Sequence, residues 1–301
     1  MAYGSIDSVH LSSEEVVSPG FCTHHSSPEP HQPRAKLGLP SKMLLLLHFL
    51  LRIRQALVLH VAASCRFILK FSSPQLRIEP MRALFVTTSS NSLAPDHPTG
   101  LWLEEFAVPY MAATEAGIDV IVASPKGGAV PLDPKTAPNE KQSKEWAPAL
   151  QALRTSVTLG SVKDQSFDGV FIPGGHGPMV DLARDSTLHE LIARHDAAGK
   201  LIAAMCHGPA ALVHAKRTNG EPFFKGRRAT GFTNTEERLA GLKDVVPFLL
   251  EDAMKESGAD FHSGLVPMLS HIEQDGNLLT GQNPHSSAAL ATKLVEALSP
   301  H

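Results

Sequence analysis

From residue 81 onward, short apolar runs alternate with longer stretches of helical character. The apolar runs predict buried strands at residues 82–87, 118–124, 169–173 and 201–205. Helices are predicted at about 100–116, 149–155, 186–198 and 286–298, and another begins near Gly208. Strands separated by helices of this length indicate a parallel sheet with helices on both faces. The expected fold class is therefore α/β, a three-layer sandwich around a mostly parallel central sheet.

Two connections add to this pattern. The segment from residue 125 to about Ala147 is rich in Pro and Lys and is interpreted as an irregular connection. Near the C-terminus, the pair Asp275-Gly276 separates residues 271–273 from residues 278–280. An Asp-Gly pair between two apolar segments is a strong hairpin signal, so we expect an antiparallel hairpin there.

The first eighty residues have a different character. Residues 1–42 are rich in Ser, His and Pro without apolar periodicity, which predicts disorder. The apolar run at 43–51 is too short to span a bilayer, and Arg52 and Arg54 follow it, so no stable membrane insertion is expected. We divide the chain into an N-terminal extension, 1–80, disordered or divergent, and a catalytic domain, 81–301. Met81, which opens the first convincing strand, is a candidate natural start.

The extension also contains a basic segment that lacks acidic residues, between Glu29 and Glu79. Such composition is typical of organelle transit segments. Asp7, Glu14 and Glu15 precede it, whereas a transit signal begins at the N-terminus. The expected location is cytoplasmic, since the few cysteines fit a reducing compartment. Mitochondrial targeting by the extension is the alternative, and a divergent extension or a start assigned too far upstream are the other interpretations.

Bulk composition narrows the classes of function. With 301 residues, 43% hydrophobic and 19% charged, the chain can form a globular domain with a sizeable core. A formal net charge of -3 and the lack of a basic stripe give no reason to expect a nucleic-acid partner. The three cysteines, Cys22, Cys65 and Cys206, show no C-x-x-C spacing, which argues against a disulfide framework and against structural zinc.

The segment at 201–212, Leu-Ile-Ala-Ala-Met-Cys-His-Gly-Pro-Ala-Ala-Leu, places one Cys between an apolar strand and a helix. The carboxyl end of a central strand is where open α/β sheets bind ligands, and a helix N-terminus favours a thiolate. This arrangement is the nucleophile elbow of serine hydrolases with Cys in place of Ser. A lone Cys after a buried strand is more often a core residue. The flanking His207 and Gly208 favour a nucleophilic Cys206 instead.

A glycine-rich loop follows the adjacent predicted strand. Backbone N–H groups of Gly174, Gly175 and His176 could line the same crevice and stabilise an oxyanion or bind substrate. Glycine-rich strand ends are also common as simple tight turns. The combination with Cys206 favours the functional interpretation.

Five segments together resemble a known superfamily; they lie at 99–109, 173–177, 204–209, 230–237 and 279–284. The chain is similar to the PfpI-like superfamily of class I glutamine-amidotransferase-like fold, which includes the parkinsonism-associated deglycase. The similarity is greatest to its branch of glutathione-independent glyoxalases and heat-shock chaperones. The resemblance implies a flavodoxin-like sheet over 81–301. Residues 1–80 have no counterpart in the pattern of that superfamily.

The resemblance also assigns roles to four side chains. Cys206 is the expected nucleophile, His207 its neighbouring base, Glu237 the acidic partner and Glu105 the carboxyl close to the sulfur. His207 could otherwise be an ordinary residue at a helix start. Glu237 could complete a capping box with Asn234, three positions earlier, and the two roles are compatible.

The spacing around Glu105 predicts its environment. It shares a largely apolar helix face with Leu101, Val108 and Ala112, so its carboxyl should be desolvated, partly protonated and able to hydrogen-bond a thiolate. The alternative is a solvated helix residue, and the neighbouring Glu104 is interpreted as one.

Three functions remain open. The first is a lyase of the glyoxalase III (D-lactate dehydratase) type, free of cofactor and metal. It converts methylglyoxal and related 2-oxoaldehydes to D-lactate through a Cys206 hemithioacetal held by Gly175 and His207 N–H groups. The second is a stress chaperone or redox sensor in which Cys206 is oxidised, and the third is amide or peptide hydrolysis.

Two further expectations accompany these hypotheses. Glutamine amidotransferases use a distant His-x-Glu pair, and the one such triplet here, residues 271–273, lies on the predicted hairpin, so amidotransfer ranks lower. Relatives of this fold are often dimers, which implies a homodimer.

Overall fold

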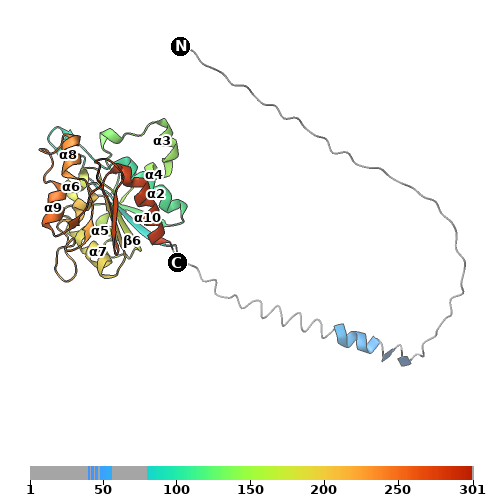
Figure 1. Cartoon of the computed structure of the whole chain (residues 1–301). Helices are drawn as coiled ribbons and strands as arrows, with labels where there is room; N and C mark the ends of the chain where they lie inside the picture. Colours follow the sequence, from blue (N-terminus) through green and yellow to red (C-terminus); the bar gives the residue numbers. More distant parts are fainter. Residues whose placement is uncertain (1–39, 41, 44, 47, 56–79, 300–301) are drawn as a thin grey trace, which may run out of the picture. The chain divides into compact units, whose positions relative to one another are not determined.

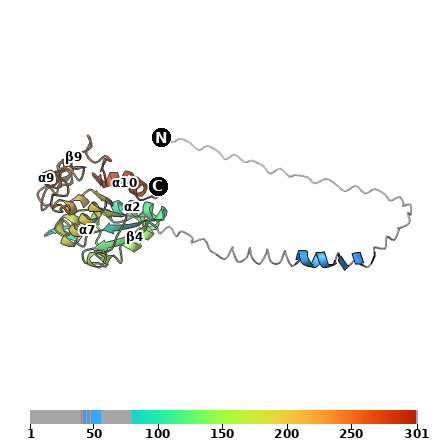
Figure 2. The ribbon, with the colours of Figure 1, turned by 90° about the horizontal axis from the view of Figure 1, so that it is seen from below.

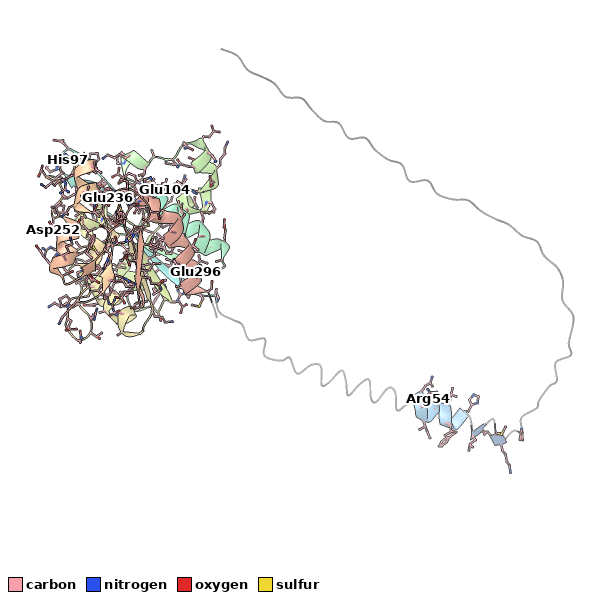
Figure 3. All side chains as sticks on the ribbon, in the orientation of Figure 1. Arg54, His97, Glu104, Glu236, Asp252 and Glu296 are labelled. Carbon is pink, nitrogen blue, oxygen red and sulfur yellow. The ribbon has the colours of Figure 1, made fainter. Side chains whose placement is uncertain are left out.

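The computed structural model describes residues 40, 42–43, 45–46, 48–55 and 80–299. The chain divides into two units, Met1–Leu76 and Arg77–His301. In the first unit the described residues from 42 to 55 are helical with exposed side chains, Arg54 among them (Figure 3). The predicted disorder of residues 1–42 concerns positions almost entirely outside the described residues. Among the described residues, every helix is too short or too polar to cross a bilayer.

The second unit is built on a seven-stranded sheet (Figure 1). Its strands are β1 (Arg82–Val86), β4 (Asp119–Ser124), β5 (Val157–Thr158), β6 (Gly169–Ile172), β7 (Leu201–Met205), β10 (Ile272–Asp275) and β11 (Leu278–Gly281). The spatial order is β10-β11-β7-β6-β1-β4-β5. All neighbours are parallel except β10 and β11, which form the antiparallel hairpin predicted at Asp275-Gly276.

Helices cover both faces of this sheet (Figures 1 and 2). One layer contains α2 (Leu103–Glu115), α4 (Ala147–Ala152) and α10 (Ser287–Leu298). The other contains α5 (Leu159–Val162), α6 (Gly177–Asp181), α7 (Ser186–Ala197), the 3₁₀ helix η2 (Gly208–Leu212) and α9 (Leu250–Glu256). The predicted three-layer α/β fold with a mostly parallel sheet is confirmed.

Smaller elements complete the unit. They are the strands β2 (Ser92–Ala94), β3 (His97–Pro98), β8 (Arg228–Ala229) and β9 (Asp260–Phe261), the helices α3 (Glu140–Glu145) and α8 (Asn234–Ala240), and the 3₁₀ helices η1 (Pro134–Thr136) and η3 (Pro284–Ser286). Of these, α8 carries a side chain of the candidate site.

The two helical layers explain why the strands at the centre of the sheet are largely apolar. Along β1, Leu84 and Val86 pack into one core, whereas Ala83 and Phe85 pack into the other. Because both faces of the sheet are covered, a polar residue at any of these positions would be buried. The Phe85 ring meets the Phe171 ring of β6 edge to face, with centroids 4.9 Å apart.

The connection before Ala147 differs from the prediction because it contains α3. Its N-cap is Asn139, whose side chain accepts from the backbone N–H of Gln142 while the Gln142 side chain accepts from the Asn139 N–H. This reciprocal capping box supports a short helix in a stretch whose Pro and Lys content indicates a loop. The helix α2 also begins three residues later than predicted, since Leu101 pairs with the 131–133 segment instead.

The element after Cys206 begins at Gly208, as expected, but it is a five-residue 3₁₀ helix rather than a full α-helix. Short 3₁₀ turns have few aligned peptide dipoles, so this helix end stabilises a thiolate less than the sequence pattern predicts.

Gly208 allows the chain after β7 to lie directly against β6. A β-carbon at this position would lie 2.2 Å from the carbonyl oxygen of Ile172, which is backbone and cannot move aside. We expect Gly208→Ala to lower the free energy of unfolding by about 1–3 kcal/mol, measured by urea denaturation. The matched control is Gly160→Ala in α5, where a β-carbon meets nothing within 4 Å. That variant should gain stability, by at most about 1 kcal/mol; equal losses in both variants would contradict the packing argument.

Candidate active site

The nucleophile candidate, Cys206, lies on a sharp turn at the carboxyl end of β7. Its φ of 55° is left-handed, a conformation that residues with a β-carbon adopt at an energetic cost. Two backbone hydrogen bonds hold the turn: the Cys206 N–H donates to Gly281 over 2.8 Å, and the Phe232 N–H donates to the Cys206 carbonyl over 3.0 Å. The side chain is directed into the site and only 3% of the residue is exposed.

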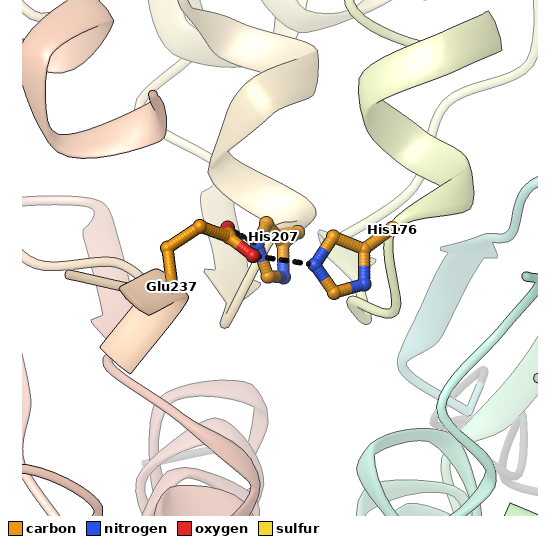
Figure 4. A group of neighbouring side chains, drawn as sticks. All are labelled: His176, His207 and Glu237. Carbon is orange, nitrogen blue, oxygen red and sulfur yellow. Dashed lines mark hydrogen bonds and ion pairs between the residues drawn. The ribbon is translucent and has the colours of Figure 1, made fainter. Parts of the chain in front are cut away.

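His207 connects the sulfur to a carboxylate. Its Nδ1 lies 3.4 Å from the Cys206 Sγ, and its Nε2 lies 2.7 Å from the Glu237 Oε2 (Figure 4). Glu237 comes from α8 and is buried. An imidazole between a thiol and a carboxylate is the arrangement of a cysteine–histidine–acid triad.

A second imidazole binds the same carboxylate. The His176 Nε2 lies 3.0 Å from the other oxygen of Glu237, Oε1, and the His176 and His207 ring centroids are 4.0 Å apart (Figure 4). His176 was expected to contribute to an oxyanion or substrate site through the glycine loop. The structure instead places its side chain on the acidic partner, so Glu237 bridges two histidines.

The charges of this cluster follow from these contacts. Burial acts to raise the pKa of Glu237, but the hydrogen bonds from His176 and His207 outweigh it and lower that pKa to about 2. Burial and the neighbouring His176 lower the pKa of His207 to about 4. At neutral pH the carboxylate is therefore ionised and the His207 imidazole neutral. Because Nε2 then carries the proton donated to Glu237, the Nδ1 lone pair is left to accept the thiol proton.

The same three side chains could also hold a divalent cation, since their ligand atoms lie within 4.8 Å of one another. Binding would require both Nε2 atoms to give up their protons. Each carboxylate oxygen is already paired with one imidazole nitrogen, which fits a proton-carrying chain better than a metal centre.

Glu105, on α2, is the carboxyl that acts directly on the sulfur. It is fully buried, its Oε2 accepts from the Gly174 N–H over 2.8 Å, and its Oε1 has no hydrogen-bond partner in the described part of the chain. Burial raises the pKa of Glu105 to about 8, against the opposing effect of hydrogen bonds from Cys206 and Gly174. The carboxyl is thus mostly protonated at neutral pH, as its apolar helix face predicts, while Glu104 is exposed.

The glycine loop brings these groups together. A β-carbon on Gly174 would lie 2.7 Å from the Glu105 Oε2 and 2.8 Å from the Cys206 Cβ, so only glycine fits between them. The Gly174 N–H is occupied by Glu105, whereas the N–H groups of Gly175 and His207 act on the sulfur. Of the three loop residues considered from sequence, Gly175 is therefore the one whose N–H acts on the sulfur, and its oxyanion role stays a prediction.

The resting state of the sulfur differs from the expectation of a thiolate. Burial and the adjacent Glu105 raise the pKa of the Cys206 thiol, and the N–H groups of Gly175 and His207 only partly oppose this. The thiol therefore keeps its proton at rest.

The capping box proposed for Glu237 and Asn234 is displaced by one residue. Thr233 is the N-cap, and its hydroxyl oxygen accepts from the Glu236 N–H while Glu236 accepts from the Thr233 N–H. Thr and Asn both serve as N-caps, so the sequence admits both registers. The observed register leaves Glu237 to face the histidines.

The His-x-Glu triplet on the hairpin pairs within itself. The His271 Nε2 lies 3.0 Å from the Glu273 Oε1 at strand β10, the outer strand of the sheet. The imidazole beside the sulfur is that of His207, so this triplet does not supply the base of Cys206.

Comparisons with known proteins identify the family. The chain is 27% identical over 230 residues to "Glutathione-independent glyoxalase hsp3101" of Schizosaccharomyces pombe, covering 69% of this chain and 93% of the relative. The structure of the Francisella tularensis Rapid Encystment Protein 24 kDa is 33% identical, with a TM-score of 0.69 over 73% of this chain and all (100%) of that one. Glyoxalase III of Candida albicans shares the fold, at 24% identity and a TM-score of 0.66 over 73% of this chain and 98% of that one. Residues 100–297 match the DJ-1/PfpI family, and because this match covers well over half of the sequence, the chain belongs to that family.

Proposed function

We propose that this protein is a glutathione-independent glyoxalase that converts methylglyoxal and related 2-oxoaldehydes to 2-hydroxy acids, with D-lactate formed from methylglyoxal. The observation that carries the proposal is the placement of one buried thiol between a neutral imidazole and a protonated carboxyl. A thiol so placed can add to an aldehyde because the neutral imidazole can accept a proton and the protonated carboxyl can donate one. The glyoxalase named among the relatives supports the same reaction.

The first step forms a hemithioacetal. The Cys206 proton passes to the His207 Nδ1, and the sulfur attacks the aldehyde carbon. The oxygen that gains negative charge accepts hydrogen bonds from the N–H groups of Gly175 and His207 and then takes up a proton. The ionised Glu237 stabilises the imidazolium that exists in between.

The second step moves hydrogen between two adjacent carbons. His207, with Glu105 beside the sulfur, removes the proton from the former aldehyde carbon to give an enediol, and a proton returns to the neighbouring carbon. The product is a thioester of the 2-hydroxy acid, and water hydrolyses it to release the acid and restore the thiol. The aldehyde carbon is oxidised as the ketone carbon is reduced, so the step needs no external oxidant.

Substrate size favours this reaction over the hydrolysis of polypeptides. A nucleophile on a residue that is 3% exposed is reachable by a three-carbon aldehyde more readily than by a peptide backbone. The homodimer and the cytoplasmic or mitochondrial location stay predictions from the sequence.

Removing the nucleophile tests the proposal directly. We expect Cys206→Ala to lower the rate of D-lactate formation from methylglyoxal without glutathione by at least about 10³-fold, because no covalent intermediate can form. The measurement is a D-lactate assay on the full chain, with circular dichroism to verify folding. Lactate formation at the wild-type rate by a folded Cys206→Ala protein would refute the mechanism.

The protonation of Glu105 predicts a dependence of stability on pH. With a pKa of about 8 when folded, against 4.5 ordinarily, this carboxyl keeps its proton over a range in which the unfolded chain releases it. Its contribution to stability is thus greatest at low pH and is lost as the pH rises from about 4.5 to 8, by up to about 1.4 kcal/mol per pH unit. Glu105→Gln cannot ionise, so its stability relative to wild type should rise between pH 5 and pH 8.

Urea denaturation at several pH values measures this difference. The matched control is Glu104→Gln, on the same helix turn but exposed, whose difference from wild type should stay nearly constant with pH. A pH-independent difference for Glu105→Gln would show that Glu105 is ionised in the folded protein.

A further inference from the structure

The residue next to the triad acid, Glu236, is a fully buried carboxyl that the proposed mechanism does not use (Figure 3). All of its hydrogen-bond donors are neutral. Its Oε2 accepts from the N–H and the hydroxyl of Thr233, at 2.9 Å each. Its Oε1 accepts from the Met268 N–H at 2.8 Å, the Gln282 Nε2 at 2.9 Å and the Asn283 Nδ2 at 2.8 Å.

These bonds keep the carboxyl ionised. Burial acts to raise the pKa of Glu236, but the donors of Thr233, Met268, Gln282 and Asn283 together lower it below its ordinary value. A buried charge without a counter-ion is costly and persists only where hydrogen bonds replace its hydration. A capping box alone would need one of these two carboxylate oxygens, so the second oxygen serves another purpose.

That second oxygen joins α8 to the segment that also holds the nucleophile turn. Gln282 and Asn283 directly follow Gly281, whose carbonyl accepts from the Cys206 N–H. Glu236 therefore connects the start of α8 to the end of β11, within two residues of the hydrogen bond that fixes the Cys206 backbone. The third connection is the hydrogen bond from the Met268 N–H, and Met268 itself adopts a left-handed φ of 65°.

The first turn of α8 sets the position of the triad acid. The Glu237 N–H donates to the Thr233 carbonyl over 2.9 Å, and Thr233 is itself held by Glu236. Side chains of adjacent helical residues point about 100° apart, so Glu236 can face the β11 end while Glu237 faces the imidazoles. Asn234, at the start of this seven-residue helix, also donates to Glu251 and Asp252 of α9, so Glu236 supplies the connections toward β11.

We propose that Glu236 is the positioning residue of this site, and that its carboxylate holds the first turn of α8 against the end of β11 so that Glu237 keeps its bonds to both His207 and His176. The negative charge of Glu236 also favours the imidazolium form of His207. The turnover readout for this role rests on the proposed glyoxalase function, whereas the chemical reactivity of Cys206 does not.

The test compares Glu236→Gln with Glu251→Gln in the full chain. The control residue, Glu251 on α9, accepts from the Asn234 N–H over 2.8 Å. Its substitution by Gln therefore removes one negative charge from the same helix start and leaves the contacts with the end of β11 unchanged. Three quantities are measured for each variant: kcat and KM for methylglyoxal, the iodoacetamide alkylation rate of the Cys206 peptide at pH 7 by mass spectrometry, and the thermal unfolding curve.

For Glu236→Gln we expect kcat to fall by about 10- to 100-fold with KM changed by less than about threefold, because a small displacement of the acid weakens the base without altering substrate binding. Alkylation of Cys206 should slow by about tenfold, since thiolate formation depends on His207. For Glu251→Gln every value should stay within about twofold of wild type.

Three results would overturn the proposal: wild-type kcat and alkylation in Glu236→Gln, equal losses in Glu251→Gln, or losses that only track the unfolded fraction. If Glu236→Gln does not fold, the proposal is tested with Gln282→Ala, which removes one hydrogen-bond donor to the Glu236 carboxylate. This variant should reduce kcat and the alkylation rate of Cys206 together by about three- to tenfold. If wild type makes no lactate, the glyoxalase proposal fails, while the alkylation rates still test the role of Glu236.

Discussion

One buried carboxylate, that of Glu237, organises the site by accepting a hydrogen bond from each of two imidazoles. The two bonds keep the carboxylate ionised inside the protein and orient both rings. They also determine the tautomer of His207, because the nitrogen that faces Glu237 must carry the proton. In the proposed reaction the opposite nitrogen takes the proton of Cys206, so the proposed reactivity of the thiol depends on this bridge.

The two carboxyls of the site have opposite charge states for physical reasons. Glu105 lies on an apolar helix face with one backbone donor and is kept protonated, whereas Glu237 meets two imidazole donors and is ionised. When the environment shifts the pKa values of two groups in opposite directions, one group can act as an acid and the other can stay ionised. The α/β sheet makes this possible because the ends of β6 and β7 bring loops from distant parts of the chain to one edge.

Several local features could be predicted because neighbouring residues alone decide them. The strands follow from apolar runs that both helical layers bury, and the hairpin follows from Asp275-Gly276, where Gly276 adopts a left-handed φ of 57°. The helix α3 and the register of the α8 cap could not be predicted with the same certainty. Both depend on short polar caps, and adjacent residues such as Thr233 and Asn234 can each begin a helix.

The sequence by itself determined the α/β sandwich, the turn that places Cys206 at the edge of the sheet, and the apolar helix face around Glu105, because each depends on residues close together in the chain. Only the tertiary structure decided that His176 binds Glu237, that Glu236 ties α8 to the end of β11, and that the resting thiol keeps its proton. Those three outcomes depend on burial and on hydrogen bonds between segments far apart in the sequence, which no local pattern of residues records.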